Sequence, residues 1–183
     1  VTGVQTCALP ILALKADRYE LQTDISFFMN AAVATRGGVV VHDSGSAPYT
    51  STGSGAAMDQ GVALVKEKAV ANTDVPVGIL LNDVVNKDLT RTHLNQHKDE
   101  VQLGSKVTIL RKGYVVTNKI DSVTVAPGDV AYASASAAGN ITNVCAASVV
   151  ASGNLPIGRF LSRIDEDGYA KVEVNLPNHG TNN

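Results

Sequence analysis

The residues best suited to chemistry are two histidines in a polar segment, His93 and His97. Their i, i+4 spacing would place both imidazoles on one face of a helix, with Asp99 and Glu100 nearby, as in many metal sites. The zinc protease pattern, however, requires a glutamate directly after the first histidine, and Leu94 stands there. The pattern therefore favours a solvated segment or a subunit contact, and no metal site is expected.

Other short motifs for catalysis or nucleotide binding are incomplete. Gly53-Ser54-Gly55 lacks the third glycine of a dinucleotide turn, and no lysine followed by serine or threonine completes a phosphate loop. No Gly-x-Ser-x-Gly nucleophile elbow is present. Cys145 stands in the apolar run NVCAASVV, where a cysteine is usually a small core residue. By elimination, we expect the chain not to be an enzyme and to need no cofactor.

Charge and hydropathy narrow the range of partners. The chain has 15 Lys and Arg against 17 Asp and Glu, a net charge of −2, so it lacks the basic surface that nucleic acid binding requires. No apolar run approaches the roughly 18 residues of a membrane span. One of the two cysteines, Cys7, belongs to an unusual N-terminal stretch, so Cys145 has no partner for an intrachain disulfide. We expect neither nucleic acid nor membrane as a partner.

The N-terminal stretch, VTGVQTCALPI, is neither a signal peptide nor a periodic element. It has no positively charged start, and Thr, Gly, Gln and Pro interrupt its apolar runs. Codons for these eleven residues can be chosen so that the DNA sequence looks like a common short-read sequencing adapter. We therefore expect residues 1–11 to be non-native, and the natural N-terminus to be missing or to lie near Leu12.

The elements that would position any site are predicted to be strands. Aromatic residues make up 4% of the chain, Trp is absent, and 16 glycines accompany many Ser, Thr and Asn residues. This composition predicts an all-β domain, sandwich-like or barrel-like, of short antiparallel strands. Strands are expected at 36–42, 62–66, 76–81, 106–111, 114–119, 123–126, 130–134, 141–145, 157–164 and 169–175.

Turn residues and one weak internal similarity indicate how these strands are connected. Hairpins are predicted at Lys112-Gly113 and at 165–168, the second with an acidic tip. The body, 31–183, is expected to form two lobes that meet near the polar segment 86–100. The sequences PVGILLNDV at 76–84 and PIGRFLSRI at 156–164 resemble each other. Either they are equivalent strands of two similar halves, or the likeness is chance.

The segment 12–30 is predicted to be an extended N-terminal arm, because apolar and polar residues alternate along part of it. Its large apolar residues are Tyr19, Leu21, Ile25, Phe27, Phe28 and Met29. Burying each of the last four would contribute about 1.5–3 kcal/mol, against a cost of about 1–2 kcal/mol for each backbone residue that becomes ordered. The arm therefore needs a surface to pack on, either the core of its own chain or a partner protein.

A family resemblance covers nearly all of the chain after residue 11. The segments that carry it are DISFFMNAAVATRGGVVV (24–41), PVGILLNDVVNKDLTR (76–91), NQHKDEVQLGSKVTILRKGYVVTN (95–118), GDVAYAS (128–134) and PIGRFLSRIDEDGYAKVEVNLP (156–177). In their order along the chain and in their residue composition, these segments resemble the cement or decoration proteins on the heads of tailed bacteriophages. The resemblance implies a non-catalytic β-rich virion protein, made in the bacterial cytoplasm, that binds the outer surface of the capsid. It would act as a homotrimer, or alternatively a dimer.

Under this resemblance the partner is the major capsid protein, whose subunit contacts the chain would stabilise. The expected contacts with the capsid or a neighbouring subunit are Tyr19, Leu21, Ile25, Phe27, Phe28 and Met29. An extended arm can add backbone hydrogen bonds by strand addition, and several copies in one oligomer bind at high effective concentration. Weaker candidates for oligomer contacts are Arg91, His93 and His97.

Two functions of other classes compete with this interpretation. The first is a receptor- or carbohydrate-binding module of a head fibre or tail, which would use the loop at 43–55 and the polar segment 86–100. Tyr49 is the only aromatic residue in those two segments, whereas sugar-binding modules usually present several. The second is a metal-dependent enzyme that uses His93 and His97.

Overall fold

The computed structural model describes residues 13–43, 63–69, 75–85, 100–122, 124–145 and 155–176. The regular elements in these residues are all strands, which confirms the all-β prediction. None of the described residues forms a helix that could cross a membrane. The strands are β1 (Tyr19–Asp24), β2 (Phe28–Met29), β3 (Val39–His42), β4 (Leu64–Glu67), β5 (Pro76–Leu80), β6 (Asp83–Val84), β7 (Glu100–Val101), β8 (Ile109–Thr117), β9 (Val130–Ala133), β10 (Ile141–Thr142), β11 (Pro156–Phe160) and β12 (Ala170–Asn175).

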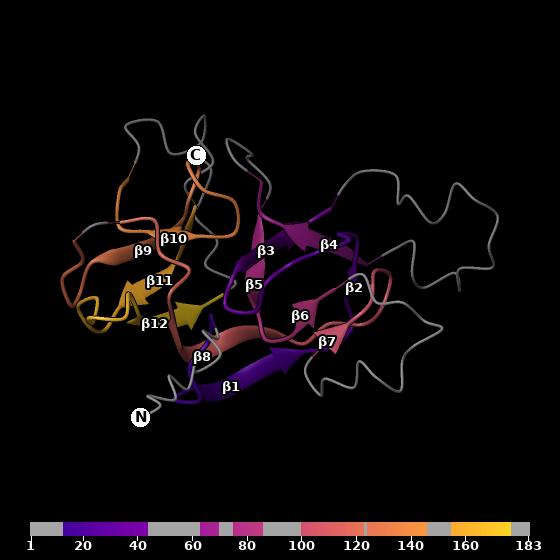
Figure 1. Ribbon diagram of the computed structural model, residues 1–183, viewed down its shortest axis with the longest axis horizontal. Helices are drawn as coiled ribbons and strands as arrows, with labels where there is room; N and C mark the ends of the chain where they lie inside the picture. Colours follow the sequence, from indigo (N-terminus) through magenta and orange to yellow (C-terminus); the bar gives the residue numbers. More distant parts are fainter. Residues whose placement is uncertain are drawn as a thin grey trace, which may run out of the picture.

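Ten of the strands form one sheet in the order β10-β9-β11-β12-β8-β5-β3-β4-β2, with β1 also paired to β8. The neighbours are antiparallel except for β2 and β4. The short strands β6 and β7 form a separate parallel pair. Figure 1 shows β9–β12 on one side of the molecule and β2–β7 on the other, with β8 running below both groups.

The long strand β8 joins the two groups. Its Ile109 and Leu110 pair with β5, and its residues from Lys112 to Thr117 pair with β12. The strand β1 pairs with residues of β8 that also pair with β5 or β12. It therefore lies along one edge of β8, and β5 and β12 lie along the other. The predicted hairpin at Lys112-Gly113 is therefore wrong, because both residues lie inside a continuous strand. Gly113 serves a close approach: a Cβ there would lie 1.9 Å from the carbonyl oxygen of Tyr19.

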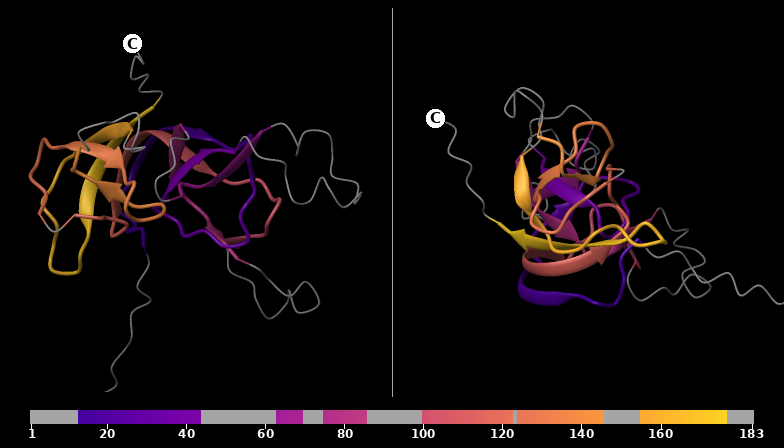
Figure 2. Two further views of the ribbon diagram at one scale, coloured as in Figure 1. Left: turned by 90° about the horizontal axis from the view of Figure 1, so that it is seen from above. Right: turned by 90° about the vertical axis from the view of Figure 1, so that its left-hand side faces the viewer.

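The chain forms two barrel-like units that share β8. Unit 1 comprises β1–β5 and the first half of β8, and unit 2 comprises the second half of β8 and β9–β12. In unit 1, β1 continues into β2, and the pairing runs through β4, β3, β5 and β8 back to β1. In unit 2, β8 continues to Ile120, which bridges β10 in parallel, and the pairing returns through β9, β11 and β12. Closing a sheet in this way protects most of its edges (Figure 2).

The two units are a structural repeat, because their strands pair in the same register. Equivalent Cα partners are Val39–Ile79 and Val130–Arg159, Val40–Gly78 and Ala131–Gly158, Val41–Pro76 and Tyr132–Pro156, and Leu80–Ile109 and Phe160–Val172. In both units a register shift lies between the proline and the glycine two residues after it. The similarity between 76–84 and 156–164 therefore marks equivalent strands of two similar halves. The predicted meeting place of two lobes, 86–100, lies almost wholly outside the described residues.

The repeat extends to the cores. Each of the buried residues in the core of unit 1 has an equivalent among the hydrophobic residues of unit 2. In chain order, Met29, Ala34, Val40, Val65, Val77, Leu80, Val84, Val107 and Ile109 correspond to Ile120, Val125, Ala131, Ile141, Ile157, Phe160, Ile164, Ala170 and Val172. Each unit thus has an apolar centre of its own, built from Val, Ile, Leu and Ala with one large residue, as a small closed barrel requires.

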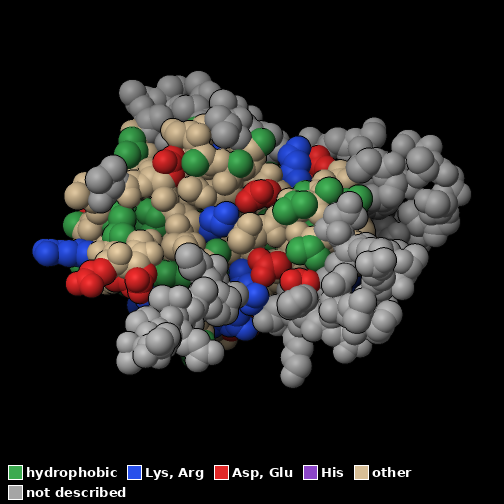
Figure 3. All heavy atoms as spheres, viewed as in Figure 1, with side chains coloured by type: hydrophobic (Ala, Val, Ile, Leu, Met, Phe, Trp, Pro, Cys, Tyr) green, Lys and Arg blue, Asp and Glu red, His purple; other side chains and the backbone are tan. Residues whose placement is uncertain are grey.

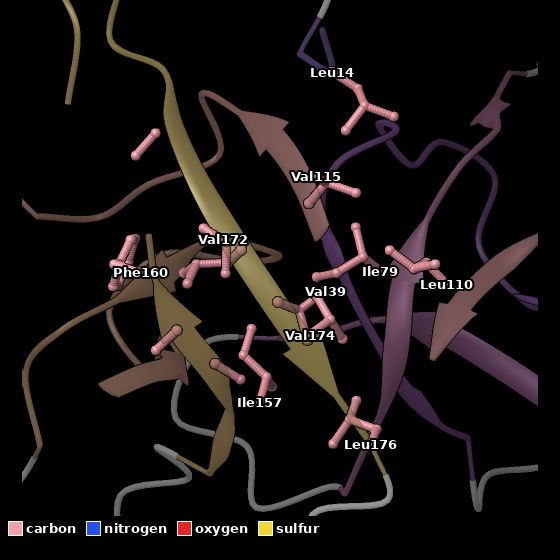
Figure 4. Packing of buried hydrophobic residues seen from close by; sticks show 14 of the residues in the cluster. Leu14, Val39, Ile79, Leu110, Val115, Ile157, Phe160, Val172, Val174 and Leu176 are labelled. Carbon is pink, nitrogen blue, oxygen red and sulfur yellow. The ribbon is translucent and has the colours of Figure 1, made fainter. Parts of the chain in front are cut away.

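A second apolar layer joins the units, and we call it the junction. The outer face of unit 1 supplies Val39, Ile79, Leu81 and Leu110, and unit 2 supplies Val115, Ala133, Val174 and Leu176. Leu14 completes the layer, and Figure 4 shows most of these side chains together. Neighbouring residues of β5, such as Ile79 and Leu80, therefore face different apolar layers, which explains why the whole strand is buried.

Glu67 lies where a turn of unit 2 meets β4 of unit 1. The N–H of Gly139 donates to the carbonyl of Lys68 at 2.8 Å, and its carbonyl accepts from the N–H of Val39 at 2.8 Å. A Cβ on Gly139 would lie 2.3 Å from Oε1 of Glu67, so the carboxyl group faces this turn closely. Burial raises the pKa of Glu67, and the nearby charge of Lys119 opposes that shift.

The substitution Glu67→Gln is expected to increase stability at neutral pH. Because the folded-state pKa of Glu67 is raised, its favourable contribution is present at low pH and is lost as the pH rises through that pKa. Urea unfolding at about pH 4 and pH 7 should show a gain for the variant at pH 7 and a smaller difference at pH 4. The matched control is Glu166→Gln on the exposed hairpin tip, and an equal gain in both variants would refute this effect.

Candidate functional site

The strand β1 is an exposed edge of the sheet. Among the described strands it pairs with β8 alone, and five of its six side chains are exposed. In the right-hand view of Figure 2, β1 is the lowest strand, with β8 directly above it. The N–H and C=O groups on the outer side of such a strand can pair with an added strand. This edge contains Tyr19 and Leu21, which the sequence singled out.

A β-bulge directs Leu21 toward solvent. The register runs from Glu20 opposite Gly113 to Gln22 opposite Lys112, so Leu21 has no partner on β8. The side chain of Leu21 is 67% exposed. Because an extra residue in one strand redirects its side chain, bulges often serve binding. The bulge therefore presents a large apolar residue at a defined point of the edge.

Beside this bulge, the sheet surface forms an open groove of about 520 Å³. Its lining is drawn from three strands and a loop: Tyr19, Leu21, Lys112, Gly113, Tyr114, Leu161, Glu173, Val174 and Asn175. The rings of Tyr19 and Tyr114 lie 6.0 Å apart between centroids, a spacing typical of paired aromatic residues. Tyrosine and leucine walls next to one lysine and one glutamate suit an amphipathic protein segment better than a small polar ligand.

Ionic and cation–π contacts hold the start of the arm to unit 2. Lys171 places Nζ 3.7 Å from the ring centroid of Tyr114 and 3.5 Å from Oδ2 of Asp17. Lys15 donates to Oδ2 of Asp165 at 2.6 Å. This hydrogen bond is the main cause of the raised pKa of Lys15 and of the lowered pKa of Asp165. The groove wall formed by β1 is therefore fixed at its N-terminal end by several contacts.

The turn after β1 is fixed by Asp24. The N–H and hydroxyl of Ser26 donate to Oδ1 of Asp24 at 2.8 and 2.5 Å. The hydroxyl bond is the main reason that the pKa of Asp24 is lowered, and Arg111 adds a smaller effect in the same direction. Ile25 lies in this turn with its side chain 62% exposed. A second large apolar residue is thus presented beside the edge strand.

The six predicted contact residues divide into two groups. Tyr19, Leu21 and Ile25 are exposed, whereas Phe28 and Met29 are buried in their own chain. Phe27 is partly buried and packs against the core of unit 1. The sequence did not decide whether the arm packs on its own chain or on a partner protein. Phe27, Phe28 and Met29 pack on their own chain. Only the exposed residues are available to a partner in this conformation.

Several other sequence predictions lie outside the described residues. They include Arg91, His93, His97, Tyr49 and most of the loop at 43–55. Within the part of the chain that the structure describes, no group of three or more His, Cys, Asp or Glu side chains could hold a metal ion. The groove residues Tyr114, Leu161 and Glu173 were missed, because they come from distant strands and only the pairing of β1 with β8 brings them near Leu21.

The expectation that Cys145 is a core residue is wrong, because its side chain is exposed. The strand β10 ends at Thr142, before the apolar run reaches Cys145. The side chain of Asn143 donates to the carbonyl of Thr124 at 3.0 Å and to Asp129 at 2.9 Å. These bonds fix a turn, so the apolar sequence that follows no longer continues the buried strand.

Comparison with known proteins gives one family. The family described as "Structural cement protein (E217 gp24/Pam3 gp6)" matches residues 20–175. The match covers both units and begins within β1. No curated protein matches the chain.

Proposed function

The chain belongs to the phage structural cement protein family, and from this premise we propose that it binds the outer surface of the capsid and stabilises contacts between major capsid subunits. Membership of the family assigns it a structural role in the virion. The edge strand β1, with its bulge at Leu21, is the observation that supports the finer proposal.

The proposed capsid contact consists of Tyr19, Leu21 and Ile25 together with the groove beside them. An extended capsid segment would pair with the open edge of β1 and place apolar side chains against Leu21. The backbone hydrogen bonds would supply affinity, and the groove would select the side chains that fit. Many copies bound to one shell would link neighbouring capsid subunits repeatedly. Contacts of modest individual affinity would therefore add up to strong overall binding.

The substitution Leu21→Asp is expected to weaken capsid binding by at least about 30-fold, the effect of losing a central apolar anchor. Leu21 is exposed, so the variant should keep the melting temperature of the natural chain. Binding would be measured by cosedimentation with phage heads that lack the cement protein. Deleting residues 12–30 is a poorer test, because it removes the buried Met29.

Val33→Asp is the matched control, because Val33 is 65% exposed and lies outside β1 and its groove. This variant should bind heads as the natural chain does. Equal binding by Leu21→Asp and the natural chain would refute the role of β1. Equal losses in the two variants would show that any added surface charge disturbs binding, and would equally contradict the proposed site.

A further inference from the structure

A lysine, an aspartate and an asparagine meet at the buried end of the arm, and we call them the triad. Nζ of Lys66 donates to Oδ1 of Asp43 at 3.0 Å. Nδ2 of Asn30 donates to Oδ2 of the same carboxyl group. One carboxyl group thus contacts both an amine and a side-chain amide, two groups that can react with each other.

Three neighbouring strands bring the triad together. The strands β2 and β4 are parallel, and the N–H of Asn30 donates to the carbonyl of Val65 at 2.7 Å. Asn30 therefore lies next to Lys66 in this register, with both side chains on the same face of the sheet. Asp43 directly follows β3, and its N–H donates to the carbonyl of Leu64 at 2.9 Å. Backbone hydrogen bonds therefore fix the position of the triad.

The carboxyl group of the triad is shielded from water. Acidic and basic side chains lie next to one another at several places on the face shown in Figure 3. Exposed pairs of that kind contribute little to stability, because water solvates both charges well. The side chain of Asp43 is only 6% exposed, and that of Lys66 is 28% exposed. Because charge is costly away from water, this environment favours transfer of a proton from the lysine to the aspartate.

The amide of Asn30 has an oxygen that could accept such a proton. Its Oδ1 is buried and has no hydrogen-bond partner within the described residues, which is a costly arrangement. Rotation of the amide exchanges its oxygen and nitrogen, and the oxygen then faces Asp43, where a protonated carboxyl group can donate to it. This hydrogen bond would polarise the amide carbon. Because Asp43 also holds the amine of Lys66, a nucleophile and a polarised carbon share one site.

We propose that Lys66 and Asn30 join in an isopeptide bond, with Asp43 as the catalytic carboxyl group. After giving a proton to Asp43, Nζ of Lys66 attacks Cγ of Asn30 while the carboxyl group donates to the amide oxygen. The intermediate then breaks its Cγ–Nδ2 bond, and Nδ2 leaves as ammonia. The three protons of the lysine ammonium group end on the new amide, on the departing ammonia and on Asp43. One C–N bond forms and one breaks, so no oxidant or other co-reactant is needed.

The bond would tie the arm to unit 1 at a weakly paired strand. β1 leads into β2, which has two residues and pairs, among the described strands, with β4 alone. A force applied to β1 therefore reaches the sheet through few backbone hydrogen bonds. A covalent bond between Asn30 and Lys66 would carry that force directly. This inference goes beyond capsid binding and does not rest on it.

The test is the intact mass of the full chain under denaturing conditions. The natural chain should be lighter than its sequence predicts by one molecule of ammonia. After digestion, the peptides that contain Asn30 and Lys66 should be recovered as one branched species. Lys66→Arg keeps a cation beside Asp43 but lacks the reactive amine, so it should have the full mass of its sequence. Asp43→Asn keeps both reacting groups but removes the proton carrier, and it should also have its full mass.

Lys15→Arg is the matched control, because Lys15 donates to Asp165 at 2.6 Å and that carboxylate contacts no asparagine side chain within the described residues. This variant should still lose ammonia. A natural chain of full mass would overturn the proposal and leave the triad as an ion pair with a hydrogen bond. So would an ammonia loss located at another asparagine, or a branched peptide recovered from Lys66→Arg. If Asp43→Asn does not fold, the natural chain and Lys66→Arg still decide between these outcomes.

Discussion

The substitution Gly158→Ala is expected to destabilise the protein by about 3 kcal/mol, the upper end of the range for overpacked sites. A Cβ at Gly158 would lie 1.8 Å from the carbonyl oxygen of Glu173, which belongs to the neighbouring strand. Backbone atoms in a paired strand cannot rotate away as a side chain can, so β11 and β12 would have to separate. Urea unfolding of the natural chain and the variant measures the difference directly.

The matched control for this effect is Gly128→Ala. Gly128 has a φ of +97°, but a Cβ at that residue would have no atom within 4 Å. Its substitution should cost about 1–2 kcal/mol, from backbone strain alone. If Gly158→Ala costs no more than Gly128→Ala, the close approach of the two strands is not as tight as described.

The same close approach explains why the repeat is visible in the sequence. In unit 1 a Cβ at Gly78 would lie 2.4 Å from the carbonyl oxygen of Leu110, the equivalent of Glu173. Both units therefore need glycine at the third position of a strand that begins with proline. The residues common to PVG and PIG thus reflect a constraint from the backbone. The residues directly after the two glycines differ, because Ile79 is buried in the junction whereas Arg159 is exposed.

The strands were largely predictable, because most of them alternate apolar and polar residues or form short apolar runs. The continuity of β8 was not, since a lysine and a glycine between two apolar runs are also the signal of a hairpin. What distinguishes the two cases is the carbonyl of Tyr19 beside Gly113, a contact between residues far apart in the chain. Local sequence carries no information about that contact.

The candidate capsid contact was also only partly predictable from the sequence. Six large apolar residues of the arm were predicted as contacts, and three of them, Tyr19, Leu21 and Ile25, are exposed. Their role as contacts stays a prediction. Phe28 and Met29 could not be separated from them by sequence, because a buried strand and a partner-binding arm share the same apolar pattern. The bulge at Leu21 depends on the register with β8, and register depends on the whole sheet.

The substitution Phe160→Ala is expected to destabilise the protein by about 3–5 kcal/mol, through the cavity left in the core of unit 2. Phe160 is fully buried, and its equivalent in unit 1 is Leu80. Leu80→Ala, the paired variant, should cost about 2–5 kcal/mol. Losses of this size are a large part of the roughly 5–15 kcal/mol that stabilises a typical domain. Scanning calorimetry of both variants would measure them.

The calorimetry also tests whether the units unfold together. β8 supplies Ile109 to the core of unit 1 and Val115 to the junction, so unfolding either unit removes a strand from the other. Both variants should therefore show one transition, with the calorimetric enthalpy equal to the van't Hoff enthalpy. Two transitions, only one of them shifted by Phe160→Ala, would contradict this coupling. A single shifted transition would mean that a shared strand and a buried junction make two repeated barrels one cooperative structure.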